Sequence, residues 1–260
     1  MKIKPVFIGL LLMLVFASCG TEFRLAKDFV AQSPQIQVAA YFPEAAEVAS
    51  VVDDKGDYSH VLDSVDQNLF LDIMYAAYAE GLQSYQMNVY VPDNPDEVPT
   101  DSLHWLVIVT KVELQGLYTD YVDHLFDFAD EYDYSFALNT VNVASWFDLN
   151  DGEWQPTQFD EFNLKDDFKS WVTNNRQEGA QYHYEITPLK ASNVYDYAAY
   201  LGKRYAALTF NYMMNRFIEQ GMAAKNLYPR FKLRWNPSDQ GLYFQMEDEG
   251  FIELKAEDSL

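Results

Sequence analysis

Histidine is the side chain that most often binds metal ions or moves protons near neutral pH, and this chain contains four. His60, His104, His124 and His183 lie far apart in the sequence, with no His-x-x-x-His pair and no neighbouring cysteine. A zinc site needs three or four such ligands together, so the sequence predicts no metal site. His104 lies inside an apolar run and is better explained as a histidine satisfied within the core.

Nucleophilic and phosphate chemistry have equally little support. A serine hydrolase of the α/β type would carry a Gly-x-Ser-x-Gly elbow, and the sequence contains none. It also lacks the glycine-rich loop that binds phosphate groups through backbone N–H groups. We therefore predict no catalytic residue and no cofactor of these classes.

Carboxylates are the one abundant chemical group, with 40 Asp and Glu residues. Two acids at a suitable separation would suffice for a glycosidase, but sequence order does not give separations in space, so that alternative stays open. The densest cluster comprises Asp127, Asp130, Glu131 and Asp133. Because acids are so frequent, we interpret this cluster as a solvated face.

One acidic segment, Asp148-Leu149-Asn150-Asp151-Gly152, superficially matches a calcium-binding loop. Its glycine falls one place early, and the acidic twelfth position of such a loop would be Phe159. A hairpin turn at Asn150 to Gly152 explains the segment better, because glycine readily takes the positive φ that such turns require.

The single cysteine, Cys19, ends a signal-peptide pattern. Lys2 and Lys4 precede an uninterrupted apolar run over 6–16, which two small residues separate from Cys19. The run is too short for a transmembrane helix, which needs about 20 apolar residues. Residues 16–19, Phe-Ala-Ser-Cys, resemble the bacterial lipobox, whose cysteine is acylated and becomes the new amino terminus. We predict a lipoprotein signal peptide at 1–18 and lipidation of Cys19, which anchors the protein to a membrane through buried acyl chains.

Charge narrows the choice of partners. Cleavage before Cys19 would leave 242 residues with 16 Lys and Arg against 40 Asp and Glu, a net charge of −24. Nucleic acid is therefore not expected as a partner, because its binding requires neutralisation of phosphates. The same excess of acid predicts repulsion from anionic lipid headgroups, so we expect the lipid to anchor the protein unaided.

Aromatic residues make up 16% of the chain, and their role distinguishes two functions. Tyr and Phe favour strands and cores, which is the interpretation we prefer. Exposed aromatic rings can also form platforms that stack on sugars. Two or more tryptophans in one open groove would favour glycan binding, whereas burial of all five would exclude it. The five are Trp105, Trp146, Trp154, Trp171 and Trp235.

Hydrophobic spacing predicts the elements that would position these residues. Apolar residues three or four apart predict amphipathic helices at 59–81 and 192–221. Alternating apolar residues predict strands near 36–42, 87–91, 103–114, 132–149 and 182–186. We expect a short helix at 160–172. Residues 116–130 fit a helix by spacing and a strand by composition, so their structure stays open.

The order of these elements behind a lipobox is similar to that of envelope-assembly lipoproteins, which include the curli-secretion lipoprotein and the activators of peptidoglycan polymerases. The segment Asn139 to Trp154 resembles the strand and Asp-x-x-x-Gly-Glu turn of their sheets. This resemblance implies a helix-backed sheet that serves as a docking module without catalysis.

The aromatic-rich composition and Ser18-Cys19-Gly20 also resemble lipoproteins of the Bacteroidota. There, export to the cell surface tends to follow an acidic run after the cysteine. Residues 20–24 lack such a run, which favours the periplasmic face of the outer membrane.

Together these observations predict an α+β protein: a tether at 19–34, a domain at 35–222 and a small C-terminal β extension at 223–260. The domain should hold a largely antiparallel sheet with the two helices packed on one face. We expect a non-catalytic, lipid-anchored envelope protein that binds an envelope protein or glycan partner, alone or as a subunit of a larger complex. The alternative is a carbohydrate-binding or carbohydrate-active surface lipoprotein.

Overall fold

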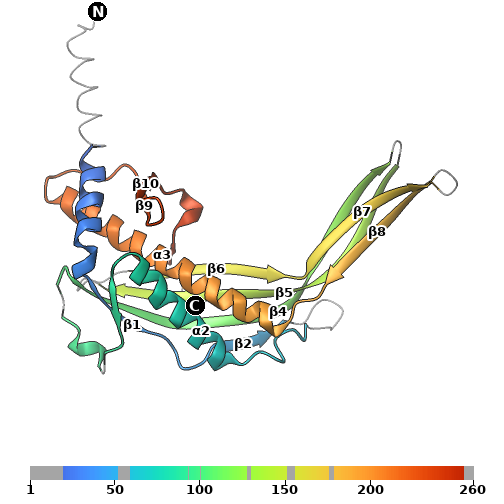
Figure 1. The fold of residues 1–260 in the computed structure, drawn as a ribbon, viewed down its shortest axis with the longest axis horizontal. Coiled ribbons are helices and arrows are strands. Elements are labelled where there is room, and N and C mark those ends of the chain that lie inside the picture. Colours follow the sequence, from blue (N-terminus) through green and yellow to red (C-terminus); the bar gives the residue numbers. More distant parts are fainter. Residues whose placement is uncertain are drawn as a thin grey trace, which may run out of the picture.

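The computed structural model describes residues 20–51, 59–92, 94–99, 101–127, 130–150, 156–175 and 179–254. It confirms a mixed α+β fold in which helices cover one side of a seven-stranded sheet (Figure 1). The predicted signal peptide, Cys19 and Trp154 lie outside the described residues. Within those residues, no helix is long and apolar enough to cross a membrane.

The main sheet has the strand order β11-β6-β5-β4-β1-β3, and β2 also pairs with β4. Its strands are β1 (Gln37–Tyr41), β2 (Glu47–Ser50), β3 (Asn88–Tyr90), β4 (His104–Asp127), β5 (Asp130–Asn150), β6 (Thr157–Lys165) and β11 (Ile252–Leu254). The pairs β1–β3, β1–β4 and β2–β4 are parallel, and the pairs β4–β5, β5–β6 and β6–β11 are antiparallel. The sheet is therefore mixed, and the prediction of a largely antiparallel sheet is confirmed only in part. A helical crossover between β1 and β3 explains the parallel half.

Two segments differ from the predicted elements. Residues 116–130, left open above, lie in β4 and at the start of β5 wherever they are described. The helix expected at 160–172 is wrong, because this segment forms the end of β6 and most of β7 (Asp167–Asn175). Phe162 and Leu164 alternate with polar residues, and both pack against the core from one face of β6.

The two main helices are α2 (Gln67–Ser84) and α3 (Ala191–Ala223). Helix α2 begins later than the predicted residue 59 because the Asp66 side chain accepts hydrogen bonds from the N–H groups of Asn68 and Leu69, at 3.0 and 3.1 Å. The helices pack closely where Gly81 faces Ala206 and Gly202 faces Ala77. Short 3-10 turns occur at Ser33–Gln35, Pro95–Glu97 and Glu247–Glu249.

The segment expected as a polar tether is instead mostly helical. Residues 20–32 form the N-terminal helix (blue in Figure 1), which packs against α3. The Phe29 ring lies 5.4 Å from Phe210 and 5.6 Å from Phe217, and Leu25 lies against Gly221. Its apolar stripe is only a few residues long, which explains why periodicity did not reveal it.

The C-terminal extension forms a small hairpin, β9 (Leu233–Asn236) with β10 (Gly241–Phe244), before β11 joins the main sheet. Side chains of α3 hold β9 in place. The Leu233 N–H donates to Asn215 Oδ1 at 2.8 Å, and Asn215 Nδ2 donates to the Leu233 carbonyl at 2.7 Å. The Trp235 N–H donates to Asn211 Oδ1 at 2.9 Å, so two asparagines provide hydrogen bonds that a neighbouring strand would otherwise supply.

Candidate functional site

A long β arm projects from the body of the molecule (Figure 1). Strand β4 pairs with β2 only as far as Gly116, and β5 pairs with β6 only from Thr140. Beyond these residues, among the strands that the structure describes, 117–127 and 130–139 pair only with each other, over about 35 Å. A second hairpin of β7 and β8 (Gly179–Thr187) lies against them. We call these four segments together the arm.

Aromatic rings fill the space between the two hairpins of the arm. Tyr134 stacks on Tyr182 with ring centroids 3.9 Å apart. Phe168 lies 4.6 Å from Tyr121 and 4.8 Å from Phe136. Because side chains alternate across a strand, every second residue of each hairpin meets the other, which makes the arm a two-layer structure. Part of the aromatic content is therefore explained by packing.

A polar contact also joins the two hairpins. The Tyr182 hydroxyl donates to Asp123 Oδ2 at 2.7 Å. Hydrogen bonds from Ser170 and Tyr182 hold the pKa of Asp123 below its ordinary value. Burial and the hydrogen bond to this carboxylate raise the pKa of Tyr182 to about 12. The contact therefore requires an ionised Asp123 and a neutral Tyr182.

This contact should make the arm sensitive to alkaline pH. The folded-state pKa of about 12 lies above the ordinary tyrosine pKa of 10.0, so the stabilisation is complete below pH 10.0 and is lost as pH rises through about 12. NMR of ring-labelled tyrosine should show one resonance titrating near 12 that is missing in Tyr182→Phe. Replacement of Asp123 by Asn should lower that midpoint, and a Tyr182 midpoint near 10 would contradict the assignment.

The arm also presents open strand edges. Within the described part of the chain, no strand pairs with the outer edges of 117–127, 130–139, β7 or β8. These four segments contain eight acidic residues and one basic residue. Charged side chains on an exposed strand edge discourage pairing with arbitrary strands. Such an edge can still pair with a strand that carries the complementary charge. The arm is therefore suited to pairing with a partner segment that carries positive charge.

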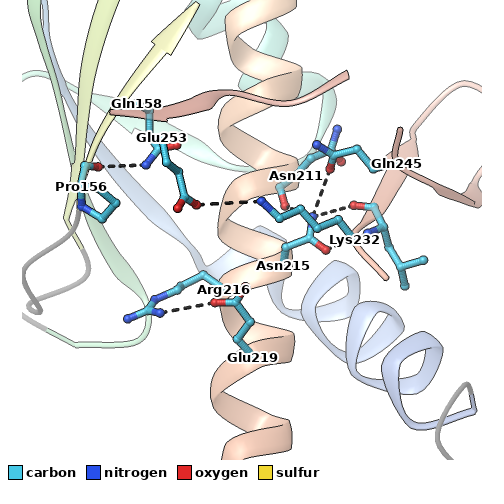
Figure 2. Close-up of polar contacts among 10 residues, drawn as sticks. Pro156, Gln158, Asn211, Asn215, Arg216, Glu219, Lys232, Gln245 and Glu253 are labelled. Atoms are coloured by element: carbon cyan, nitrogen blue, oxygen red, sulfur yellow. Dashed lines mark hydrogen bonds and ion pairs between the residues drawn. The ribbon is translucent and has the colours of Figure 1, made fainter. Parts of the chain in front are cut away.

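A polar pocket of ≈ 180 Å³ lies at the other end of the sheet, between α3, β6 and the C-terminal extension (Figure 2). Its lining includes Gln158 from β6, Arg216 and Glu219 from α3, and Lys232 and Glu253 from the extension. Arg216 Nη1 lies 3.4 Å from Glu219 Oε2, and Lys232 Nζ lies 3.9 Å from Glu253 Oε1. Charged groups of both signs and amides thus surround one small cavity.

Gln158 is the most informative residue in this pocket. Its side chain is fully buried, and Nε2 donates to the Pro156 carbonyl at 2.9 Å. Its Oε1 has no hydrogen-bond partner among the described residues. Leaving a buried acceptor unpaired costs about 1–3 kcal/mol, so this oxygen is suited to accept a bond from a small polar ligand.

The four histidines are dispersed over the molecule. Among the described residues, no three potential metal ligands lie together. His60 and His124 each lie 2.8 Å from an aspartate, and His183 stacks on Trp171 in the arm. His104 is not the core histidine expected from its apolar run, since it is half-buried at the start of β4 and 2.8 Å from Asp101. That hydrogen bond helps to lower the pKa of the Asp101 carboxyl.

The acidic cluster expected to form a solvated face lies where β4 and β5 end, at the tip of the arm. Asp127 and Asp130 are the last pair in the β4–β5 register, and Asp133 lies 2.8 Å from His124 Nδ1. The segment similar to a calcium loop ends β5 at Asn150, and its Gly152 lies outside the described residues.

The described tryptophans do not meet in one groove. Trp105 is buried, and Trp146 packs on Phe159, 5.1 Å away, with Lys111 over its ring. Trp171 is exposed on the arm, and Trp235 is half-buried in β9. The polar pocket contains none of these tryptophans. The arrangement that would have favoured a glycan-stacking platform is therefore not present among these four.

Sequence reasoning missed both the arm and Gln158. A strand longer than twenty residues is unusual, but the alternation of Tyr132, Tyr134 and Phe136 with polar residues was a usable signal for the arm. Nothing local distinguishes Gln158 from other glutamines, because its importance depends on burial beneath distant segments. Comparison with protein-family models, with curated proteins and with solved structures finds no match, so the function must be argued from these two features.

Proposed function

We propose that this protein is a lipid-anchored, non-catalytic module of the cell envelope that docks a partner protein through the arm. The arm is the observation that carries the proposal. An extended pair of hairpins, packed on each other and open along their edges, offers backbone hydrogen bonds over most of its length. The resemblance of residues 16–19 to a lipobox supplies the anchor at Cys19.

The positions of the anchor and the arm support this proposal. The N-terminal helix begins at the end of the body far from the arm (Figure 1). A lipid on Cys19 would hold that end at the membrane and leave the arm free to reach another component. We place the protein on the periplasmic face of the outer membrane, as the residues after Cys19 favour. The excess of acid on the arm selects partners with a basic edge.

The test uses a variant whose arm is shortened by joining residues that are paired across each hairpin. Joining Asp120 to Ala137 and Lys169 to Glu185 by two-residue turns removes about two thirds of both hairpins without changing strand pairing in the body. A photo-crosslinking residue at Trp171 in the native host should give a discrete protein adduct. Excess soluble intact protein should abolish the adduct, and excess shortened protein should leave it.

A matched control places the same crosslinker at Leu69, an exposed apolar residue on α2 in the body. It should give no adduct that the intact protein competes away. Equal competition by the intact and shortened proteins would overturn docking through the arm.

The second candidate function is binding of a small polar ligand, such as a glycan fragment, in the polar pocket. Gln158 Oε1 is the observation that favours it. Calorimetric titration with soluble peptidoglycan fragments should show binding that Gln158→Leu abolishes without loss of stability, because the leucine removes an unpaired acceptor. Gln115→Leu on β4, outside the pocket, should bind normally, and binding that survives Gln158→Leu would contradict a ligand at this oxygen.

A further inference from the structure

We infer that the end of the body next to Cys19 docks directly on the surface of an anionic phospholipid bilayer; this inference rests on the anchoring proposed above. We call this end the root face. Its apolar residues are Phe23, Tyr228, Phe231, Phe244 and Met246. The exposed basic residues of the same segments, which we call its rim, are Arg24, Lys27, Lys225 and Arg230.

The root face exposes large apolar side chains that lie close together. The exposed fractions are 86% for Tyr228, 67% for Met246, 55% for Phe244 and 44% for Phe231. The Phe244 ring lies 5.0 Å from Phe231 and 5.8 Å from Phe23, so these three rings form one continuous patch. Phe231, Phe244 and Met246 also border a hollow of ≈ 430 Å³. Continuous apolar patches on a folded surface mark sites of interaction.

The position of this patch identifies what it contacts. Residue 20 is the first described residue of the N-terminal helix, and Phe23 lies less than one turn beyond it. The Arg230 N–H donates to Glu22 Oε1 at 2.5 Å, which fixes the loop after α3 beside that turn. An acyl chain on Cys19 would therefore enter a bilayer immediately next to the patch. Figure 1 shows the start of the N-terminal helix, the end of α3 and the β9–β10 hairpin at the end opposite the arm.

Charge distinguishes this end from the rest of the chain. The segments that form this end, 20–28, 216–234 and 244–254, contain seven basic and seven acidic residues, whereas the arm contains one basic and eight acidic residues. Lys232 and Arg234 have carboxylate partners, at 3.9 and 3.3 Å. Within the described chain, no carboxylate lies at ion-pair distance from the four basic residues of the rim. The balanced charge of these segments should make repulsion from anionic headgroups weaker at the root face than at the arm.

Aromatic side chains beside Arg and Lys are the combination that binds at the boundary between acyl chains and headgroups. The rings enter the boundary region, while the long basic side chains reach phosphate groups. Apolar burial and attraction to anionic lipid then act together. One or two acyl chains hold a protein at a membrane without fixing its orientation, and the root face would fix it with the arm directed away.

The test uses the mature chain with Cys19→Ser, which retains every described residue but cannot be acylated. It should sediment with vesicles of phosphatidylcholine and phosphatidylglycerol. The triple substitution Tyr228→Ser, Phe231→Ser and Phe244→Ser should lower the partition coefficient roughly tenfold or more. Lys225→Gln with Arg230→Gln should remove the preference for phosphatidylglycerol over pure phosphatidylcholine. The control, Trp171→Ser with Tyr184→Ser on the arm, should bind like the parent.

Docking of the root face would be overturned if the parent did not sediment with vesicles, or if the control lost as much binding as the triple variant. It would also be overturned if the root face formed a dimer of this protein that does not bind vesicles. Tyr228→Ser alone changes the most exposed of these residues, so its partial loss of binding should occur in a fully folded protein. Mass spectrometry of the native amino terminus separates the two proposals. A bare thiol would overturn the anchor, whereas an acylated Cys19 without vesicle binding would overturn only the docking.

Discussion

Replacing Gly202 by alanine is expected to destabilise the protein by about 3 kcal/mol, although alanine is the better helix former by about 1 kcal/mol. A Cβ on Gly202 would lie 2.2 Å from the Met74 carbonyl oxygen and 2.8 Å from both Ala77 Cβ and the Tyr78 nitrogen. Two of these atoms belong to the backbone of α2, so α2 and α3 would have to move apart. Urea unfolding should show a lower midpoint with an unchanged slope, and thermal unfolding a decrease of roughly 10 °C.

Gly221→Ala in the same helix is the matched control. A Cβ there would lie 3.0 and 3.1 Å from the two methyl groups of Leu25, which can rotate away. The gain in helix propensity should offset the remaining crowding, so we expect a change within about 1 kcal/mol. Equal effects at Gly202 and Gly221 would show that the α2–α3 contact is less tight than these distances require.

Replacing Arg204 by methionine is expected to cost about 3 kcal/mol, because it leaves a buried carboxylate without its partner. Arg204 Nε donates to Asp160 Oδ2 at 3.0 Å, and Nη2 donates to Oδ1 at 2.9 Å. The Asp160 side chain is 7% exposed, and its hydrogen bonds raise the pKa of Arg204 above the ordinary value. This bidentate pair joins α3 to β6. Chemical denaturation of the purified variant measures the loss.

The double variant Arg204→Met with Asp160→Leu distinguishes two contributions to the free energy of unfolding: the stabilisation by the ion pair and the destabilisation by a buried carboxylate without a partner. We expect it to recover most of the stability, since apolar replacements of both members are often neutral. A double variant as unstable as Arg204→Met would mean that the salt bridge itself stabilises the α3–β6 contact. Lys203→Met, whose ion pair with Glu80 is exposed, should change stability by less than about 1 kcal/mol.

The α+β class and the two main helices followed from periodicity. Helix α3 has a stripe of buried residues at helical spacing, including Val194, Leu201 and Tyr205, and its predicted limits differ from the observed ones by one or two residues. The helix expected at 160–172 failed for a physical reason. Phe162, Phe168 and Trp171 suggested a helix, but only Phe168 and Trp171 have a helical spacing, and the three residues lie on two strands that meet different neighbours.

The functional surfaces depend on contacts between distant segments, which local patterns do not contain. The arm requires β7 and β8 to lie on β4 and β5, and the contact from Tyr182 to Asp123 spans 59 residues. The total charge of the chain did not reveal the difference between a strongly acidic arm and a root face whose segments are balanced in charge. The burial of Gln158 depends on the C-terminal extension, which folds over β6, so no local pattern in the sequence indicates it.

The double layer of the arm has a mechanical consequence. A single hairpin bends easily, whereas two hairpins bonded face to face by stacked rings resist bending, because flexure would require one layer to slide over the other. Strands β4 and β5 continue without interruption from the tip into the middle of the sheet. A load applied at the tip would therefore act on the body as a cantilever, and its torque would reach the layer of helices rather than being absorbed by a flexible joint.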